Sequence, residues 1–295
     1  MLSYNEYKKL IDDNLTKFIP QIDDYASKLR ESMEYSLVIG GKRLRPVLLL
    51  ASCDFNGGDI NDALPFACAL EYIHTYSLIH DDLPSMDNDE LRRGKPTNHI
   101  VFGDAIATLA GDGLLNTAAE LIMQQLIKNS DDAKISNYIK AGHAIISRAG
   151  VRGMIAGQVA DVLNEYNDAD SNLVHYIEEH KCGDLITAPV LAGLYISDAE
   201  QSMIDDFSKY AMNLGIAFQI LDDILDFEGN SELIGKNVGK DQDLGKCNYV
   251  CVHGLDAAKN ELHRLTSESI DIVKKYGDKA DFFINLAESM EKRKA

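Results

Sequence analysis

The chain has 295 residues, 45% of them apolar, and its formal net charge is −18 because 47 acidic residues outnumber 29 basic ones. This acidity argues against a general nucleic-acid binder, which needs a basic face, and against adhesion to anionic lipid. The length allows one or two domains. Since only 6 Pro occur and no stretch resembles a linker, we predict a single compact domain over residues 1–295.

The sequence indicates neither disulfides nor membrane spans. The five Cys show no disulfide framework, and Cys247 and Cys251, close to His253, lack the second ligand pair that a zinc site needs. The first 20 residues mix charges throughout, unlike a signal peptide. No run reaches the ~18 uninterrupted apolar residues of a membrane span. We therefore expect a cytoplasmic protein with reduced thiols.

Apolar residues recur at three- and four-residue spacing along most of the chain, which predicts helices. In chain order, the predicted helices are Leu2–Phe18, Asp23–Val38, Pro46–Cys53, Asp62–Asp82, Ala105–Lys128, Asp131–Ala149, Val151–Asn164, Asn172–Tyr195, Ala199–Phe227, Leu255–Tyr276 and Asp281–Lys292. We find no alternating strand pattern, Asn-Gly hairpin signal or fixed-period repeat. The predicted fold class is all-α.

An acidic cluster follows the apolar helix predicted at Asp62–Asp82, in the sequence HDDLPSMDNDE. Asp81 and Asp87 are six residues apart, so they cannot share one helical face. Pro84 lacks an N–H and clashes with the carbonyl of His80, so the helix should kink or end there. The chain can then turn back and bring Asp87 towards Asp81.

A second acidic cluster, FQILDDILDF, ends the helix predicted at Ala199–Phe227. Asp222 and Asp226 are four apart and share a face, with Cβ atoms ~5–6 Å apart. Carboxylates at this distance repel each other unless a cation lies between them, and acidic oxygen ligands select Mg²⁺ when phosphate shares the coordination. A solvated helix end would explain either cluster alone. Two clusters, each after an apolar run, favour a metal role.

The few basic residues are grouped. One block is Lys42-Arg43-Leu44-Arg45 at a predicted helix start, where backbone N–H groups favour an anion. Others are Arg92-Arg93-Gly94-Lys95 and three Gly-Lys pairs at 235–246, which do not match a nucleotide loop and could be ordinary surface lysines. His74, two helical turns before Asp81, is either a core residue or a phosphate donor. Several basic blocks with two acidic clusters fit two phosphorylated ligands.

Six motifs in order resemble the trans-prenyl diphosphate synthases, and most closely the bacterial farnesyl diphosphate synthases. They cover roughly residues 25–285 and are GGKRLRP (40–46), SLIHDDLPSMDNDELRRGKPT (77–97), GQ (157–158), HKCGDLI (180–186), FQILDDILD (218–226) and the GK-rich segment 235–249. This resemblance implies an all-α isoprenoid synthase fold, with helices around a deep central cavity, and a homodimer.

The resemblance also implies residue roles. The implied ligands of two Mg²⁺ ions are Asp81, Asp82 and Asp87, and those of a third are Asp222 and Asp226. The implied contacts of the allylic diphosphate are Arg92, Lys181, Cys182, Gln219, Lys236 and Lys246, with Cys182 standing where the family usually has Thr. The implied pocket for isopentenyl diphosphate comprises Lys42, Arg45, His74 and Arg93. The implied catalytic set is Asp81, Asp82, Asp87, Arg92, Lys181 and Asp222.

The implied reaction condenses isopentenyl diphosphate with dimethylallyl or geranyl diphosphate to give farnesyl diphosphate, after Mg²⁺-assisted ionisation of the allylic substrate. Tyr76, five residues before Asp81, matches the bulky floor of farnesyl synthases, although it could be simply a core residue. The alternatives are a geranylgeranyl diphosphate synthase and a non-catalytic subunit, which would typically have lost one Asp-rich motif. A terpene cyclase is disfavoured, because cyclases usually replace the second cluster and need no isopentenyl pocket.

Overall fold

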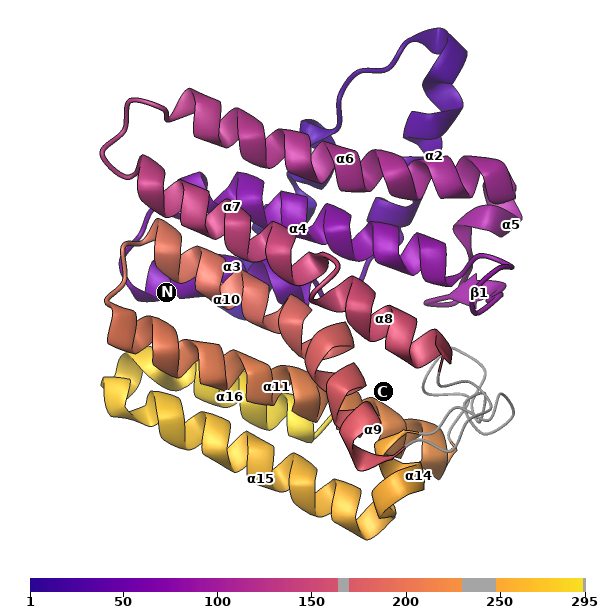
Figure 1. The fold of residues 1–295 in the computed structure, drawn as a ribbon. Helices are drawn as coiled ribbons and strands as arrows, with labels where there is room; N and C mark the ends of the chain where they lie inside the picture. Colours follow the sequence, from indigo (N-terminus) through magenta and orange to yellow (C-terminus); the bar gives the residue numbers. More distant parts are fainter. Residues whose placement is uncertain (164–169, 230–247, 294–295) are drawn as a thin grey trace. The chain divides into compact units, whose positions relative to one another are not determined.

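The computed structural model describes residues 1–163, 170–229 and 248–293, and helices dominate them (Figure 1). The described chain divides into two compact units. Unit 1 comprises Met1–Gly142 with Ala192–Asp198, and unit 2 comprises His143–Leu191 with Ala199–Ala295. The single domain over residues 1–295 stays a prediction.

Unit 1 is built around helix α4, which is buried over most of its length and packs against α3 and α6 (Figure 1). Its N-cap Asp59 accepts from the Asn61 backbone N–H at 2.8 Å, which satisfies one of the free donors of the first turn. The elements of unit 1 are α1 (Tyr4–Asp12), η1 (Leu15–Phe18), η2 (Asp24–Ala26), α2 (Ser27–Val38), α3 (Leu44–Phe55), α4 (Ile60–Asp81), β1 (Leu91–Arg92), β2 (Lys95–Pro96), α5 (Asn98–Phe102) and α6 (Asp104–Lys128).

Unit 1 is completed by the last residues of α10 (Asp184–Ile196) and the turn that follows. Gly193 packs so closely on α3 that a Cβ there would lie 2.3 Å from the Leu49 carbonyl oxygen. The Asn56 side-chain amide donates to the Ser197 carbonyl at 2.9 Å. A segment distant in sequence therefore forms part of this unit's core.

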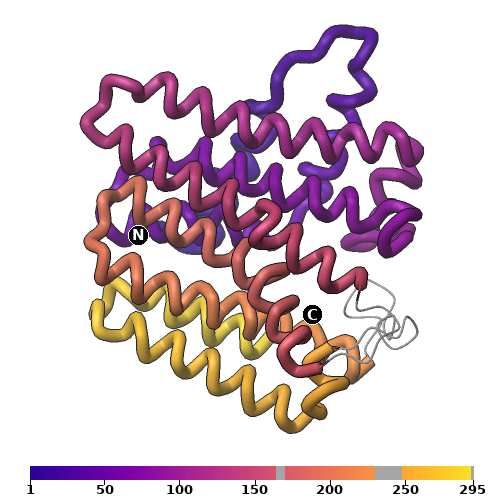
Figure 2. The backbone as a smooth tube through the Cα atoms, viewed as in Figure 1, coloured from indigo at the N-terminus to yellow at the C-terminus, as the bar shows by residue number. Residues whose placement is uncertain are grey.

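Unit 2 is built around the long helix α11, which packs along α15 (Figure 2). Its core includes Ile216, Ile220 and Ile224 of α11 with Leu262 and Leu265 of α15. The other elements after α6 are α7 (Ile135–Ala149), which enters unit 2 at His143, and α8 (Met154–Leu163), α9 (Ser171–Ile177), η3 (Glu178–Gly183), α11 (Gln201–Glu228), α14 (Tyr249–His253), α15 (Leu255–Val273), η4 (Lys274–Ala280) and α16 (Asp281–Glu291).

The predicted all-α class is confirmed, with local differences. The helix predicted at Asn172–Tyr195 contains a π-helical turn at Glu178–Gly183, and the first predicted helix ends at Asp12. A two-residue hairpin, β1–β2, pairs Leu91 with Pro96 and Arg92 with Lys95. This hairpin was not predicted, because strands of two residues are too short to show an alternating pattern. Within the described residues, no helix is long and apolar enough to cross a membrane.

Candidate active site

The first acidic cluster forms a tight turn at the end of α4. The helix ends at Asp81, and the Asp87 backbone N–H donates to the Asp81 carbonyl at 2.9 Å. The Asn88 N–H donates to the Leu83 carbonyl at 3.1 Å and closes the same turn. The predicted break before Pro84 and the return of Asp87 towards Asp81 are therefore confirmed.

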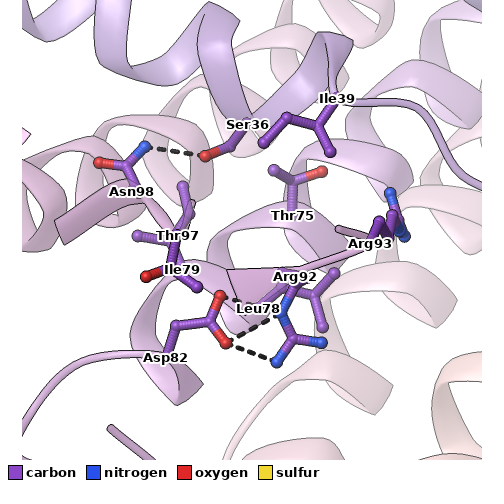
Figure 3. Close-up of a pocket in the computed structure, with 10 residues that line it drawn as sticks. All are labelled: Ser36, Ile39, Thr75, Leu78, Ile79, Asp82, Arg92, Arg93, Thr97 and Asn98. Carbon is purple, nitrogen blue, oxygen red and sulfur yellow. Dashed lines mark hydrogen bonds and ion pairs between the residues drawn. The ribbon is translucent and has the colours of Figure 1, made fainter. Parts of the chain in front are cut away.

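The hairpin that follows places Arg92 against Asp82 (Figure 3). Arg92 Nε donates to both carboxylate oxygens at 2.9 Å, and Nη2 donates to Oδ1 at 2.6 Å. Asp82 is 3% exposed, and its burial raises the pKa of the carboxyl group although Arg92 opposes the rise. A buried carboxylate needs such a partner, so Asp82 and Arg92 hold each other in this conformation.

A pocket opens beside this ion pair. Figure 3 shows Arg92 directed at Asp82, while Arg93 lies apart from the pair. The pocket is lined by Ser36, Ile39, Thr75, Leu78, Ile79, Asp82, Arg92, Arg93, Thr97 and Asn98. Its wall therefore combines apolar side chains with the Asp82–Arg92 ion pair and the Arg93 guanidinium, so Arg93 supplies the positive charge that Asp82 does not balance.

The start of α3, the loop before it and the middle of α4 form a basic region. Arg45 Nη1 lies 3.3 Å from His74 Nε2, and since a guanidinium can only donate, Nε2 accepts and the imidazole proton sits on Nδ1. Burial lowers the pKa of His74, and the charges of Arg45 and Arg93 lower it further. His74 is therefore neutral at pH 7. The region can supply positive charge to an anion through its arginines, with Lys42 exposed at the loop.

Tyr76 is a fixed, buried side chain of α4. It is 6% exposed, and its ring meets that of His80 edge-on, with centroids 5.7 Å apart and planes at 79°. His80 is itself fixed, because its Nε2 lies 3.1 Å from the Thr108 carbonyl of α6. Burial and the charge of Asp81 raise the pKa of the Tyr76 phenol to about 12. Tyr76 is thus a neutral, rigid ring one and a half turns below Asp81.

The second acidic cluster uses two faces of α11. Asp222 is one-third exposed and pairs with Arg293, whose guanidinium also lies 4.6 Å from the Phe218 ring centroid. Asp226 is also only partly buried and lies on the same helical face as Asp222, as predicted from their spacing. Asp223, in contrast, is 3% exposed and lies towards the interior of unit 2.

A chain of hydrogen bonds links the π-helical turn to α11 and α14. Cys182 Sγ donates to Gln219 Oε1 at 2.8 Å, and Gln219 Nε2 donates to Asp223 Oδ1 at 2.8 Å. Asp223 Oδ2 accepts from the Tyr249 backbone N–H at 3.1 Å. The Cys182 thiol is therefore a donor here and fixes the orientation of the Gln219 amide.

Lys181 is positioned by α8. Its ammonium group pairs with Asp161 at 2.5 Å, one helical turn after the Gly157-Gln158 motif. Gly157 is required because a Cβ there would lie 2.2 Å from the Lys181 backbone nitrogen. The close approach of α8 to the π-helical turn therefore sets the place of Lys181.

The comparisons with known proteins agree on one family. The family described as polyprenyl synthetase matches residues 26–282. The chain belongs to this family. It is 47% identical over 260 residues to the farnesyl diphosphate synthase of Geobacillus stearothermophilus, covering 88% of this chain and 86% of that one. It is 40% identical over 288 residues to the geranylgeranyl diphosphate synthase of Cyanophora paradoxa, covering 95% and 94%.

A solved relative has the same fold as this chain. The geranyltransferase of Helicobacter pylori, solved with magnesium and isoprenyl diphosphate, superposes with a TM-score of 0.85 at 27% identity. The match covers 98% of this chain and 95% of that one. The isoprenoid synthase fold, the family and the assignment as a prenyltransferase are thereby confirmed.

The carboxylates of the two acidic clusters fit magnesium by their chemistry. The five predicted ligands offer only hard oxygen donors, which Mg²⁺ prefers. Within residues 1–163, 170–229 and 248–293, no three His, Cys, Asp or Glu side chains are arranged to hold a metal ion. Mg²⁺ commonly takes one or two carboxylates and completes its shell with water and substrate phosphate, so a closed protein shell is not required. Asp82 and Asp222 each pair with an arginine where the metal charge would act.

The predicted site residues fall into two sets. Unit 1 holds Lys42, Arg45, His74, Tyr76, Asp81, Asp82, Asp87, Arg92 and Arg93. Unit 2 holds Lys181, Cys182, Gln219, Asp222 and Asp226. Lys236 and Lys246 lie outside the described residues. The roles assigned to all of these residues remain predictions.

Some residues of the site were not anticipated from the sequence. Asp161 and Arg293 pair with predicted site residues, and nothing in their local pattern singles them out. Asp184 is a buried carboxylate that pairs with Arg148 and with His180, whose Nδ1 lies 2.8 Å from Oδ2 of Asp184. Glu178 is 2% exposed, and burial raises its pKa to about 9.

Proposed function

We propose that this prenyltransferase condenses isopentenyl diphosphate with dimethylallyl and geranyl diphosphate and releases farnesyl diphosphate. The observation that carries the product length is Tyr76, a buried ring five residues, or about 7.5 Å of helix, before Asp81. A wall at that depth limits how far a growing chain can extend from a diphosphate held at Asp81. The 47% identity to a farnesyl diphosphate synthase supports the same length.

Each set of residues has a separate task in this reaction. Asp81, Asp82 and Asp87, together with Asp222 and Asp226, would hold three Mg²⁺ ions, which when bound supply Lewis-acid charge to the leaving diphosphate. The magnesium named with the Helicobacter pylori relative supports this choice of metal. Asp82 must then share or release Arg92, whose guanidinium becomes available to the same diphosphate.

Positive side chains favour departure of the diphosphate from the allylic carbon. The proposed ligands of the leaving group are Arg92 of unit 1 and Lys181, Cys182 and Gln219 of unit 2, together with Lys236 and Lys246. The apolar side chains of α4 exclude water, which would otherwise quench the allylic cation.

The second substrate is bound by the basic region. Lys42, Arg45 and Arg93 bind the diphosphate of isopentenyl diphosphate, with neutral His74 orienting Arg45, so that its double bond attacks the allylic cation. The departed diphosphate then accepts the proton that is lost, so no side chain is needed as a general base.

The test is product analysis with three allylic starters. Purified protein with Mg²⁺ and isopentenyl diphosphate should convert dimethylallyl and geranyl diphosphate to farnesyl diphosphate and extend farnesyl diphosphate slowly or not at all. A twenty-carbon product would favour the geranylgeranyl synthase, to which the 40% identity with the Cyanophora paradoxa enzyme also points. Absence of any condensation product would favour a non-catalytic subunit.

We further propose a cytoplasmic homodimer. Helix α6 exposes three large apolar side chains, Leu109 at 54%, Met123 at 55% and Ile127 at 70%. A second copy of the chain packed on α6 would remove these side chains from water, which is favourable. Light scattering after gel filtration should give twice the chain mass of 32.6 kDa, and charge substitutions at Met123 and Ile127 should shift it to the monomer.

A further inference from the structure

Helix α1 lies outside the residues that match the family, yet two of its side chains hold the loop before α3. The family match begins at residue 26, whereas α1 spans Tyr4–Asp12. The Tyr4 hydroxyl donates to the Lys42 carbonyl at 2.6 Å. Asp12 Oδ1 accepts from Arg43 Nε at 2.9 Å. Thus α1 contacts two consecutive residues of the loop that carries Lys42 and leads into α3, where Arg45 is the second residue.

Arg43 is an anchor for this loop and not a ligand-binding group. Its side chain is 2% exposed, Nη1 donates to Glu71 Oε1 at 2.7 Å, and Nη2 donates to the Leu37 carbonyl at 2.5 Å. A guanidinium with acceptors from α1, α2 and α4 has no edge left for a diphosphate. Lys42, in contrast, is exposed. In the sequence Lys42-Arg43-Leu44-Arg45, Arg43 therefore anchors the loop, whereas Lys42 and Arg45 are the proposed diphosphate ligands.

The loop backbone needs such anchors. Gly40 and Gly41 have φ of 100° and 143°, and Arg43 is left-handed with φ 54° and ψ 32°. A left-handed conformation is unfavourable for a residue with a Cβ, so it persists only where surrounding contacts enforce it. Arg93 holds the other end of the loop by donating to the Gly40 carbonyl.

Helix α1 is itself firmly attached to unit 1. Tyr7 and Ile11 are 0% exposed, and the helix begins with a capping box between Ser3 and Glu6. The second oxygen of Asp12 pairs with Lys8 at 2.8 Å, which fixes the carboxylate for Arg43. Because α1 is fixed in unit 1, its contacts with Lys42 and Arg43 restrain the loop.

We propose that α1 is part of the isopentenyl diphosphate site, in which Tyr4 and Asp12 are positioning residues that hold Lys42 and Arg45 ready for the diphosphate. This inference rests on the proposed function. Donors held in place before binding avoid the free-energy cost of ordering them with the ligand. Loosening the loop should therefore weaken binding of isopentenyl diphosphate, while the allylic diphosphate, assigned to other residues, should bind as before.

The test compares Tyr4→Phe and Asp12→Asn with the control Asp13→Asn. Asp13 lies next to Asp12, is exposed and pairs with Lys9 at 2.5 Å, so the control makes the same charge change as Asp12→Asn without touching the loop. Each test variant should raise the KM for isopentenyl diphosphate about 2- to 10-fold, as expected for loss of a hydrogen bond in Tyr4→Phe and of the charge that strengthens one in Asp12→Asn. The KM for geranyl diphosphate and kcat should stay within about twofold. The control should match the wild type.

Hydrogen exchange and pyrophosphate titration separate this inference from the proposed function. The amides of residues 40–43 should exchange faster in both test variants than in the control, and inorganic pyrophosphate should bind them more weakly by calorimetry. If the wild type makes no condensation product, the proposed function fails and these two measurements still decide the role of α1. Unchanged loop exchange, or equal rises in both KM values, would overturn the inference.

Discussion

Replacing Glu178 by Gln should change how the stability of the protein depends on pH. Glu178 is 2% exposed, and neither of its oxygens has a hydrogen-bond partner among the described residues. Burial, with the charges of Asp223 and Glu261, raises its pKa from 4.5 to about 9. Folding therefore takes up a proton between these values, and the free energy of unfolding falls as the pH rises through this window.

The slope follows from this shift of the pKa. One proton taken up on folding changes the free energy of unfolding by about 1.4 kcal/mol per pH unit. Between pH 4.5 and 7 the loss reaches about 3 kcal/mol, and it is complete only near pH 9. Gln has nearly the same shape and no such proton, so Glu178→Gln removes this loss.

Urea denaturation at pH 5, 6, 7 and 8 in EDTA would measure the effect. The stability of Glu178→Gln relative to the wild type should increase steadily with pH at about the slope given above. Glu179→Gln is the matched control, because Glu179 is adjacent but only partly buried, and its curve should run parallel to the wild type. A parallel curve for Glu178→Gln as well would refute protonation of Glu178 on folding.

Three further outcomes are expected. Tyr76→Ala should lengthen the product beyond fifteen carbons by chromatography, and an unchanged length would place the floor elsewhere. Gly111→Ala should lower the free energy of unfolding, measured in urea, by about 1–3 kcal/mol, because the added Cβ would lie 2.1 Å from His80 Nε2. Gly113→Ala is the control and should not lower it, because the Cβ there would lie 3.0 Å from the flexible Met33 side chain. Arg293→Gln should bind Mg²⁺ more tightly by calorimetry, since the competing cation is removed; equal affinity would count against competition.

Local spacing predicted much of the fold. The apolar period gave most helices, Pro84 gave the end of α4 and the return of Asp87, and the four-residue spacing gave the shared face of Asp222 and Asp226. These predictions depend on neighbours within two helical turns, so a sequence contains the information for them.

Contacts between distant segments could not be predicted in this way. The ion pairs of Arg43 with Glu71 and of Lys181 with Asp161 join residues 28 and 20 apart, and many other pairings were chemically equivalent in the sequence. The π-helical turn was missed because Glu178–Gly183 contains no Pro that would mark a break between the helices on either side. The two acidic clusters belong to different units, so their joint role in binding magnesium stays a prediction.

The discontinuous make-up of unit 1 has a consequence for protein synthesis. Its last segment, Ala192–Asp198, begins 50 residues after Gly142 (192 − 142), so an emerging chain cannot finish this unit when residue 142 has been made. At about 5–20 residues per second, the ribosome needs roughly 3–10 s more to supply the missing piece. During that interval, the α3 surface later covered by Gly193 is open to chaperones and proteases.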